Sequence, residues 1–291
     1  METMELKALA KINLGLDVLG LRTDGYHTVR MIMQSIHLYD EVKIAKSIVP
    51  SVVVQTNLPY LPTNEKNIAY KAAVLLRDEF QIPEGVRITI EKRIPVSAGL
   101  GGGSANAAAV LFGMNRLFDL RLSMEELMKR GITLGADVPY CIMRGTVLAE
   151  GIGEILSPLP SLPKCFVLIV TPPVRVSTAK IYKALDAKSI RSHPDVDGLI
   201  DALGRGDLAG VATSMGNVLE QVTIPLHPEI DIIKQEILTS GGLGAMMSGS
   251  GPTVFGIFDT KELAHQAKER IYQKSLAKQV YVVKSHTVRR G

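Results

Sequence analysis

The spacing of hydrophobic residues predicts strands in the first part of the chain. Apolar side chains alternate with other residues over Leu6–Leu14, and short runs rich in aliphatic residues follow at Met31–Leu38, Glu41–Ala45 and Ser51–Gln55. Alternation with a period of two is typical of a strand that buries one face. We therefore expect a strand in each of these four segments.

A helical period begins after these strands and continues through the middle of the chain. Apolar residues recur at intervals of three and four positions there, as on the buried face of a helix. The predicted helices are Asn67–Phe80, Ser104–Phe118 and Ser123–Leu134, with a strand at Val86–Glu91 and further short strands near Pro139 and Thr146.

The character of the sequence changes at the proline-rich segment Ser157–Pro163. A continuous apolar run follows it, and from Ser177 onward helical periods alternate with late strands. The predicted elements are strands at Phe166–Val170, Thr253–Phe258 and Gln279–Val283 and a helix at Lys261–Gln273. We predict an α+β fold in two domains, 1–160 and 161–291, which suits a chain of 291 residues.

Composition excludes several classes of protein. Hydrophobic residues make up 46% of the chain and charged residues 21%, so that a sizeable core can form. The 33 basic and 29 acidic residues are dispersed, and no basic arm indicates a nucleic-acid partner. The two cysteines lack metal-ligand spacing, and no apolar stretch is long enough to span a membrane. We expect a cytoplasmic protein, without a membrane partner, that is a monomer or a weak homodimer.

Residues 95–107 form a glycine-rich connection between the strand at Val86–Glu91 and an alanine-rich helix. Four glycines occur within Gly99–Gly103, where missing Cβ atoms let a ligand approach the backbone closely. The helix that follows presents free N–H groups and about half a positive charge, which favours phosphate. No lysine follows as in a Walker loop, and Ser104 stands where a dinucleotide fingerprint needs glycine. Taken alone, the segment is also compatible with a tight turn.

Three motifs in order resemble those of the galactokinase, homoserine, mevalonate and phosphomevalonate (GHMP) kinase superfamily. The central one is the proline and glycine pattern of 95–104, and the C-terminal one is the glycine-rich 247–253. The N-terminal pair, 10–14 and 24–27, is similar to the signature of one branch. That branch uses ATP to phosphorylate a small polyol that carries a cytidine diphosphate group, in isoprenoid precursor synthesis.

The resemblance covers essentially the whole chain and implies a fold and an activity. The implied fold has an N-terminal α/β domain with a left-handed βαβ unit and a C-terminal ferredoxin-like domain, with the active site between them. The implied activity is phosphoryl transfer from ATP with Mg²⁺ as the metal. No carboxylate cluster in the sequence indicates a metal site, and the metal ligands stay unassigned, with Ser104 as a candidate.

Phosphoryl transfer to an alcohol needs charge stabilisation and usually a carboxylate that accepts the proton. The resemblance assigns the base to Asp137, which we expect between small residues and a proline-containing strand. It pairs Asp137 with Lys11, which would keep the carboxylate charged and stabilise the moving phosphoryl group. Taken alone, Asp137 is typical of a helix or turn cap, and Lys11 of an outward, solvated strand residue.

The resemblance also assigns two sets of binding residues. A flat cytidine ring suits aromatic faces and a few hydrogen bonds, although isolated tyrosines are more often ordinary core or surface residues. Met33 departs from the family pattern, because some members have an aromatic residue there. The ATP residues are Asn67, Pro95, Gly99, Leu100, Gly101, Gly102, Gly103, Ser104 and Ala105; the substrate residues are Asn13, Tyr26, His27, Thr178, Tyr182, Gly249 and Ser250.

Two other functions remain compatible with these motifs. A kinase of another small alcohol would share the glycine loop and the base but would gain nothing from a cytidine diphosphate group. A catalytically silent sensor would bind nucleotide or metabolite without turnover, yet it would have no need of both Lys11 and Asp137. For the segment 248–251, a plain β-turn is as compatible with the local sequence as a phosphate-binding loop.

Overall fold

The computed structural model describes residues 2–185, 190 and 192–288. Contacts divide the chain into two compact units, each of which is discontinuous along the sequence. Unit 1 comprises Met1–Ala10, Leu38–Val96 and Gly101–Met143, and unit 2 comprises Lys11–His37, Ser97–Leu100 and Arg144–Gly291. These units do not follow a single cut in the chain, and the division at residue 160 stays a prediction.

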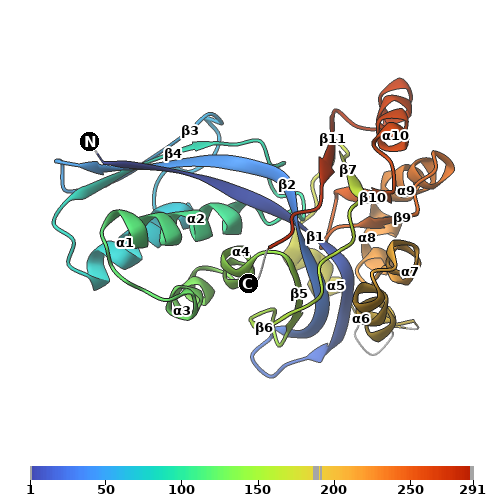
Figure 1. The fold of residues 1–291 in the computed structure, drawn as a ribbon, viewed down its shortest axis with the longest axis horizontal. Coiled ribbons are helices and arrows are strands. Elements are labelled where there is room, and N and C mark those ends of the chain that lie inside the picture. Colours follow the sequence, from blue (N-terminus) through green and yellow to red (C-terminus); the bar gives the residue numbers. More distant parts are fainter. Residues whose placement is uncertain (1, 186–189, 191, 289–291) are drawn as a thin grey trace. The chain divides into compact units, whose positions relative to one another are not determined.

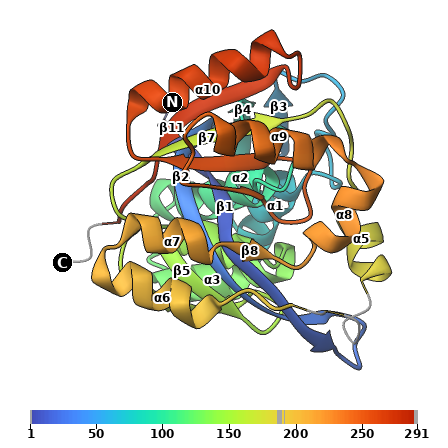
Figure 2. The ribbon, with the colours of Figure 1, turned by 90° about the vertical axis from the view of Figure 1, so that its right-hand side faces the viewer.

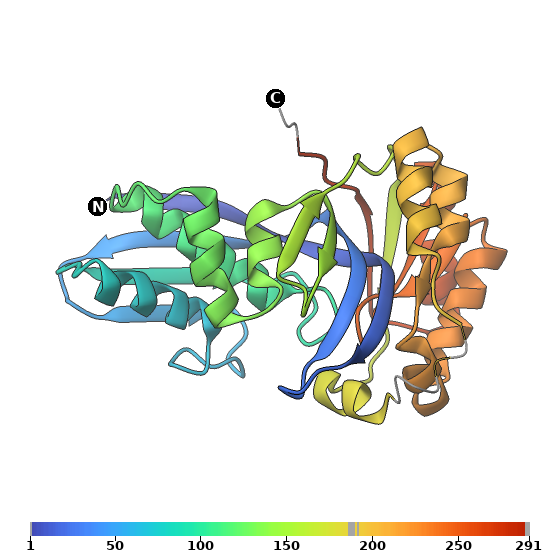
Figure 3. The same ribbon diagram turned by 90° about the horizontal axis from the view of Figure 1, so that it is seen from below.

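Unit 1 is a sheet with helices on one face. Its strand order is β3-β4-β2-β1, with β3 (Val52–Thr56), β4 (Gly85–Glu91) and the parts of β2 (His27–Ser47) and β1 (Thr3–Leu21) that belong to this unit. Figures 1 and 3 show α1 (Ile68–Glu79), α2 (Gly102–Leu117) and α3 (Met124–Leu134) on the same face of this sheet. The short α4 (Val138–Met143) packs against α2 and α3. β3 and β4 are parallel and joined through α1, and the left hand of this βαβ unit stays a prediction.

Close packing of α2 on the sheet depends on small side chains. A Cβ atom at Gly113 would lie 2.3 Å from Cδ1 of Ile44 and 2.9 Å from Cδ1 of Leu6, so a larger residue would have to displace the ends of both side chains. The alanines at 105 and 107–109 are buried as well. Since interiors are packed as densely as organic crystals, these small residues set how near α2 comes to β1 and β2.

Two helices of unit 1 begin directly after capping residues of a type that is typical of helix N-termini. Asn67 precedes α1, and its side chain accepts a hydrogen bond from the backbone N–H of Ala69. Ser123 and Glu126 form a capping box before α3. Such caps satisfy N–H groups that have no partner inside the helix, and both predicted helices therefore start within a residue of the observed ones.

Unit 2 contains a four-stranded antiparallel sheet with the order β11-β7-β10-β9. Numbered along the chain this order is 4-1-3-2, which confirms the predicted ferredoxin-like arrangement. Its strands are β7 (Phe166–Thr171), β9 (Gly244–Met247), β10 (Val254–Phe258) and β11 (Gln279–Lys284). Figure 2 shows α9 (Glu229–Thr239) and α10 (Lys261–Gln273) in front of this sheet. A Cβ atom at Gly256 of β10 would lie 2.3 Å from Cγ2 of Ile237, so α9 packs tightly on it.

The remaining elements of unit 2 extend β1 and β2 or pack around the second sheet. β5 (Thr146–Glu150) pairs with β2 and with β6 (Ile155–Pro158), and the two-residue β8 (Gly216–Asn217) pairs in parallel with β1 at Gly15 and Leu16. The helices are α5 (Thr178–Ala184), α6 (Val196–Arg205), α7 (Leu208–Ser214) and α8 (Glu220–Leu226).

Three expectations about secondary structure need correction. The runs at Met31–Leu38 and Glu41–Ala45 belong to the single strand β2, because Asp40 between them is buried and fully hydrogen-bonded instead of ending the strand. The strand predicted near Pro139 is wrong, since Pro139 lies in the first turn of α4, where its missing N–H has no intrahelical partner to lose. The sequence pattern also missed the short strands β8 and β9.

Two further findings concern the cysteines and the possibility of a membrane-spanning helix. Cys141 and Cys165 are both buried, and neither forms a disulfide bond with any described residue. Within the described ranges, every helix is too short or too polar to cross a lipid bilayer.

Candidate functional site

The glycine-rich connection ends in a helix N-terminus that lacks a side-chain cap. Ser97, Gly99 and Gly101 all have positive φ angles, 53°, 77° and 67°, and Gly101 is the N-cap of α2 without a capping side chain. The first turn of α2 contains no acidic residue. Its N–H groups are therefore available to an external anion, as the glycine pattern predicts.

Gly99 lies so close to the C-terminal glycine loop that no larger residue fits. A Cβ atom there would lie 2.1 Å from the carbonyl oxygen of Ser248, and the Ser248 hydroxyl donates to the carbonyl oxygen of Gly99 at 3.0 Å. On the other side, the backbone N–H of Lys11 donates to the carbonyl oxygen of Leu100 at 3.0 Å. Residues of all three predicted motifs are therefore in contact within unit 2: Lys11 from the N-terminal motif, Gly99 and Leu100 from the central one, and Ser248 from the C-terminal one.

The next glycines belong to unit 1 and pack against the residues around β4 and α1. A Cβ atom at Gly102 would lie 3.0 Å from Cγ2 of Ile94 and 3.2 Å from Nζ of Lys92. At Gly103 it would lie 3.4 Å from Cδ1 of Ile68, and Gly103 itself is exposed. The backbone of this turn is therefore open to solvent on one side and tightly supported on the other.

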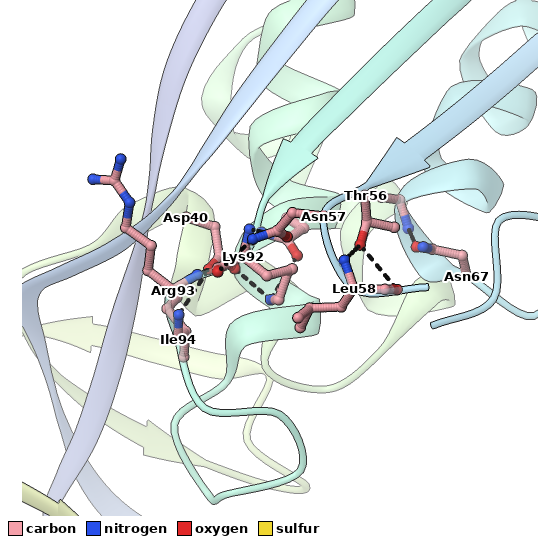
Figure 4. A network of polar contacts seen from close by, with 10 residues as sticks. Asp40, Thr56, Asn57, Leu58, Asn67, Lys92, Arg93 and Ile94 are labelled. Carbon is pink, nitrogen blue, oxygen red and sulfur yellow. Dashed lines mark hydrogen bonds and ion pairs between the residues drawn. The ribbon is translucent and has the colours of Figure 1, made fainter. Parts of the chain in front are cut away.

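The other predicted ATP residues differ in how accessible they are. Pro95, Leu100 and Ala105 are buried, so they support the loop, while Ser104 is half-buried in the first turn of α2. Asn67, which is labelled in Figure 4, caps α1, and its amide also donates to the carbonyl oxygen of Pro62, at 2.8 Å. A contact between Asn67 and adenine stays a prediction.

Lys11 is buried on β1, which rules out the outward, solvated alternative. It is 5% exposed, and its Nζ donates to Oδ1 of Asn13 at 2.9 Å. Asn13 is fully buried, and its Nδ2 contacts the sulfur of Met31 at 3.4 Å. A lysine ammonium held on a polar partner inside apolar surroundings is suited to stabilise a negative group that reaches it.

Asp137 immediately precedes α4, and its carbonyl oxygen accepts the backbone N–H of Cys141. The expectation that a strand follows Asp137 is therefore wrong, and the carboxylate belongs to a helix N-terminus instead. A helix N-terminus stabilises a carboxylate through the helix dipole. Asp137 belongs to unit 1 and Lys11 to unit 2, and the pairing of the two side chains stays a prediction.

Three of the predicted substrate residues contribute rings near the β1–β2 turn. The rings of His27 and Tyr182 are in contact, with centroids 5.4 Å apart and a tilt of 48°. Tyr26 is 60% exposed, and its backbone N–H is held by the carboxylate of Asp24. An exposed ring beside a hydrogen-bonded turn is well suited to stack on a flat ligand.

The C-terminal loop 248–251 is held by residues from several elements of unit 2. The hydroxyls of Thr178 and Ser250 are 2.8 Å apart, and Gly249 and Gly251 have positive φ angles of 58° and 88°. A Cβ atom at Gly249 would lie 3.7 Å from Oδ1 of Asn13. The predicted residues Asn13, Thr178, Gly249 and Ser250 are therefore grouped around this loop.

Asn217 is a positioning residue that sequence reasoning missed. Its Nδ2 donates to the carbonyl oxygens of Met247 and Gly249 at 2.9 and 2.8 Å, and its Oδ1 accepts from the N–H of Leu219. The asparagine is 8% exposed, so the loop's carbonyls have a buried partner. Nothing in the local sequence distinguishes Asn217, because its partners lie some thirty positions away.

Carboxylates do not gather into a preformed metal site: in the described residues, no group of three or more His, Cys, Asp or Glu side chains could hold an ion. Mg²⁺ in kinases is held largely by the substrate phosphates with one or two protein oxygens. The residues present are compatible with an ion that arrives with the triphosphate.

Comparison with known proteins identifies relatives over the full length. The family models described as GHMP kinases N terminal domain and GHMP kinases C terminal match residues 67–145 and 199–278. A 4-diphosphocytidyl-2-C-methyl-D-erythritol kinase from Lachnospira eligens is 52% identical over 99% of this chain and 100% of its own length. The enzyme of that name from Clostridium perfringens is 49% identical over 97% of this chain and 98% of its own.

Comparison with solved structures identifies kinases of the same superfamily fold. A crystal structure of 4-(cytidine 5'-diphospho)-2C-methyl-D-erythritol kinase superposes with a TM-score of 0.83 at 33% identity, covering 98% of this chain and 100% of that one. The homoserine kinase of Cytophaga hutchinsonii superposes with a TM-score of 0.79 at 23% identity, covering 99% and 95%. The second likeness concerns the fold alone.

Proposed function

Because the chain belongs to the family of 4-diphosphocytidyl-2-C-methyl-D-erythritol kinases, within the GHMP kinases, we propose that it transfers the γ-phosphate of ATP to the 2-hydroxyl of 4-diphosphocytidyl-2-C-methyl-D-erythritol. The observation that carries this proposal is the identity of 52% over 99% of the chain with a kinase of that name. The reaction is a step toward isoprenoid precursors.

The triphosphate of ATP is proposed to bind at the start of α2. The uncapped N-terminus at Gly101, the exposed Gly103 and the absence of acidic residues in the first turn support this position. Mg²⁺ would neutralise the phosphates, and the half-buried hydroxyl of Ser104 is the protein group proposed to reach it.

Asp137 is proposed to accept the proton of the acceptor hydroxyl, and Lys11 to stabilise the charge on the transferred phosphoryl group. Burial supports the role of Lys11, since an ammonium at 5% exposure interacts more strongly with an anion than one in water. The position of Asp137 directly ahead of α4 supports its role, because it places the carboxylate at a helix N-terminus. General base catalysis of this kind contributes roughly 10²- to 10⁴-fold to the rate.

The cytidine ring is proposed to lie against Tyr26 and the contacting pair His27 and Tyr182. The exposure of Tyr26 and the ring contact of 5.4 Å support this assignment. Asn13, Thr178 and the loop residues Gly249 and Ser250 are proposed to contact the polyol and diphosphate portions. Their grouping within unit 2 is the supporting observation.

The test is a coupled assay of ADP release with purified protein, Mg-ATP and the acceptor. We expect release that depends on 4-diphosphocytidyl-2-C-methyl-D-erythritol and is absent with 2-C-methyl-D-erythritol 4-phosphate, which lacks the cytidine group. Equal turnover of both acceptors would indicate a kinase of a broader class of alcohols. Tight binding of the acceptor without any ADP release would indicate a sensor.

Single substitutions test the two proposed roles separately from the acceptor. Asp137→Asn and Lys11→Met should each reduce kcat by about 10²- to 10⁴-fold while both variants stay folded. Asp119→Asn and Lys43→Met are matched controls, because these side chains are 77% and 53% exposed. The roles are refuted if either site variant retains more than half of the wild-type kcat.

Our proposals for the quaternary state and the cellular location rest on the sequence alone. A monomer or weak homodimer in the cytoplasm remains our proposal, and light scattering of the purified protein at several concentrations tests the first part.

A further inference from the structure

A buried polar cluster of Asp40, Lys92 and Asn106 lies directly behind the first turn of α2. Figure 4 shows its centre, with Asp40 and Lys92 side by side and the backbone of Arg93 and Ile94 turned toward the carboxylate. Asp40 is fully buried, the Lys92 side chain is 6% exposed and Asn106 is 4% exposed. A buried polar or charged group without a hydrogen-bond partner would destabilise the folded protein, so the partners of each group in the cluster need to be identified.

Each member of the Asp40 cluster binds the other two. Oδ2 of Asp40 accepts from Nζ of Lys92 and, at 2.8 Å, from Nδ2 of Asn106. Nζ of Lys92 also donates to Oδ1 of Asn106 at 3.0 Å, which closes the triangle. Oδ1 of Asp40 accepts the backbone N–H groups of Arg93 and Ile94 at 2.7 and 2.9 Å. One carboxylate thus satisfies four donors.

These bonds join three elements that come together at the glycine-rich loop. Asp40 lies within β2, Lys92 directly follows β4, and Asn106 lies in the second turn of α2. Nζ of Lys92 is also 3.2 Å from the position a Cβ atom of Gly102 would occupy, so the ammonium supports the first residue of α2. The cluster therefore fixes both ends of the segment that runs from β4 into α2.

The charges of Asp40 and Lys92 cancel, which favours a positioning role for the cluster over a direct electrostatic one. A lone ammonium behind a helix N-terminus would oppose the helix dipole, whereas the carboxylate of Asp40 neutralises it. The pair adds no net charge to the proposed phosphate site. Its contribution must then come from geometry, by holding the N–H groups of α2 in one place before the ligand arrives.

We propose that Asp40, Lys92 and Asn106 are positioning residues for the triphosphate of ATP, an inference that rests on the proposed function. The cluster prearranges the start of α2 and leaves recognition of the acceptor unaffected. Disrupting it should raise the KM for ATP by on the order of 10- to 100-fold, as expected when binding groups shift by a fraction of an ångström to about 1 Å, while the KM for the acceptor stays unchanged.

The decisive variant is Asn106→Ala. It removes two hydrogen bonds of the cluster, keeps the charge of the protein, and introduces the best helix former beside residues 105 and 107–109, which are already alanine. A KM for ATP raised at least tenfold, with the KM for the acceptor within twofold of wild type, supports the proposal. A KM for ATP within twofold of wild type overturns it and leaves the cluster a stability element.

A second variant, Asp40→Asn with Lys92→Met, removes both charges together and so creates no unpaired buried ion. The proposal expects the same selective rise in KM for ATP, whereas a purely electrostatic role expects no change because the net charge is conserved. The matched control is Glu236→Gln with Lys274→Met, which removes another ion pair with a buried carboxylate, between α9 and the C-cap of α10, and leaves the second partner Arg270 in contact with solvent. A similar rise in the control would also overturn the proposal.

Calorimetric binding of ATP separates this inference from the proposed function. If the wild-type protein binds ATP but releases no ADP with the acceptor, the proposed function fails, and the dissociation constants of the same variants still test the cluster. We expect the dissociation constant for ATP to rise at least tenfold in Asn106→Ala and to stay within twofold in the control.

Discussion

Replacement of Gly99 by alanine tests whether the two glycine loops must touch. Gly99 has a φ of 77°, and an added Cβ would lie 2.1 Å from the carbonyl oxygen of Ser248, 3.1 Å from its carbonyl carbon and 3.3 Å from the carbonyl oxygen of Gly251. Backbone atoms cannot turn aside as a side chain can. One of the two loops must therefore move by about 1 Å before alanine fits.

The expected cost has two parts. An L residue in the left-handed region costs about 1–2 kcal/mol in stability whatever its surroundings. A displacement of about 1 Å in groups that bind substrate costs on the order of 100-fold in kcat/KM. Gly99→Ala should therefore show both losses.

Gly206→Ala separates the two parts. Gly206 also has a positive φ, 66°, but no atom lies within 4 Å of the position of its missing Cβ. This control should lose stability by about 1–2 kcal/mol and keep its kinetics. Steady-state assays of ADP release and urea unfolding measure both quantities. If Gly99→Ala has a kcat/KM within twofold of Gly206→Ala, the close approach of the loops has no functional meaning.

Three further predictions concern unit 2. Asn217→Ala should lower kcat/KM about tenfold or more, because two carbonyl oxygens of the C-terminal loop region lose a buried donor, and Asn217→Asp, which cannot donate, should not restore it. Burial raises the pKa of the Cys165 thiol to about 11, so a disulfide reagent at pH 8 should label it only after unfolding, as counted in a Cys141→Ser background. The hydrogen bond from Lys274 lowers the pKa of Glu236, so its contribution to stability is present above pH 4.5 and is lost as the pH falls; the difference in Tm between wild type and Glu236→Gln should therefore shrink in acid.

Much of unit 1 could be predicted because its signals are local. Asn67 and Ser123 mark helix starts through bonds to residues two or three positions on, and Gly99 and Gly101 mark the turn before α2. These interactions involve neighbours in the chain, so the sequence around them contains all their partners.

Other features required the folded chain. Asp40 lies within the strand β2 and does not end it, because Lys92 and Asn106 hydrogen-bond its carboxylate. These partners are 52 and 66 positions away, so the local sequence does not reveal them. The same holds for Asn217, whose partners belong to a loop about thirty residues later. The sequence predicts a strand near Pro139, but this segment is the helix α4, which packs against α2 and α3.

The sequence alone therefore determined where α1 and α3 start and to which family the motifs belong, and it predicted the loop that we propose offers its backbone to phosphate. The tertiary structure decided which buried polar groups meet, why Gly99 admits no side chain, and that Lys11 faces Asn13 instead of water. Periodicity and capping depend on residues within a few positions of one another. The partners of a buried charge are chosen only when distant segments pack, because burial makes every unpaired polar group costly.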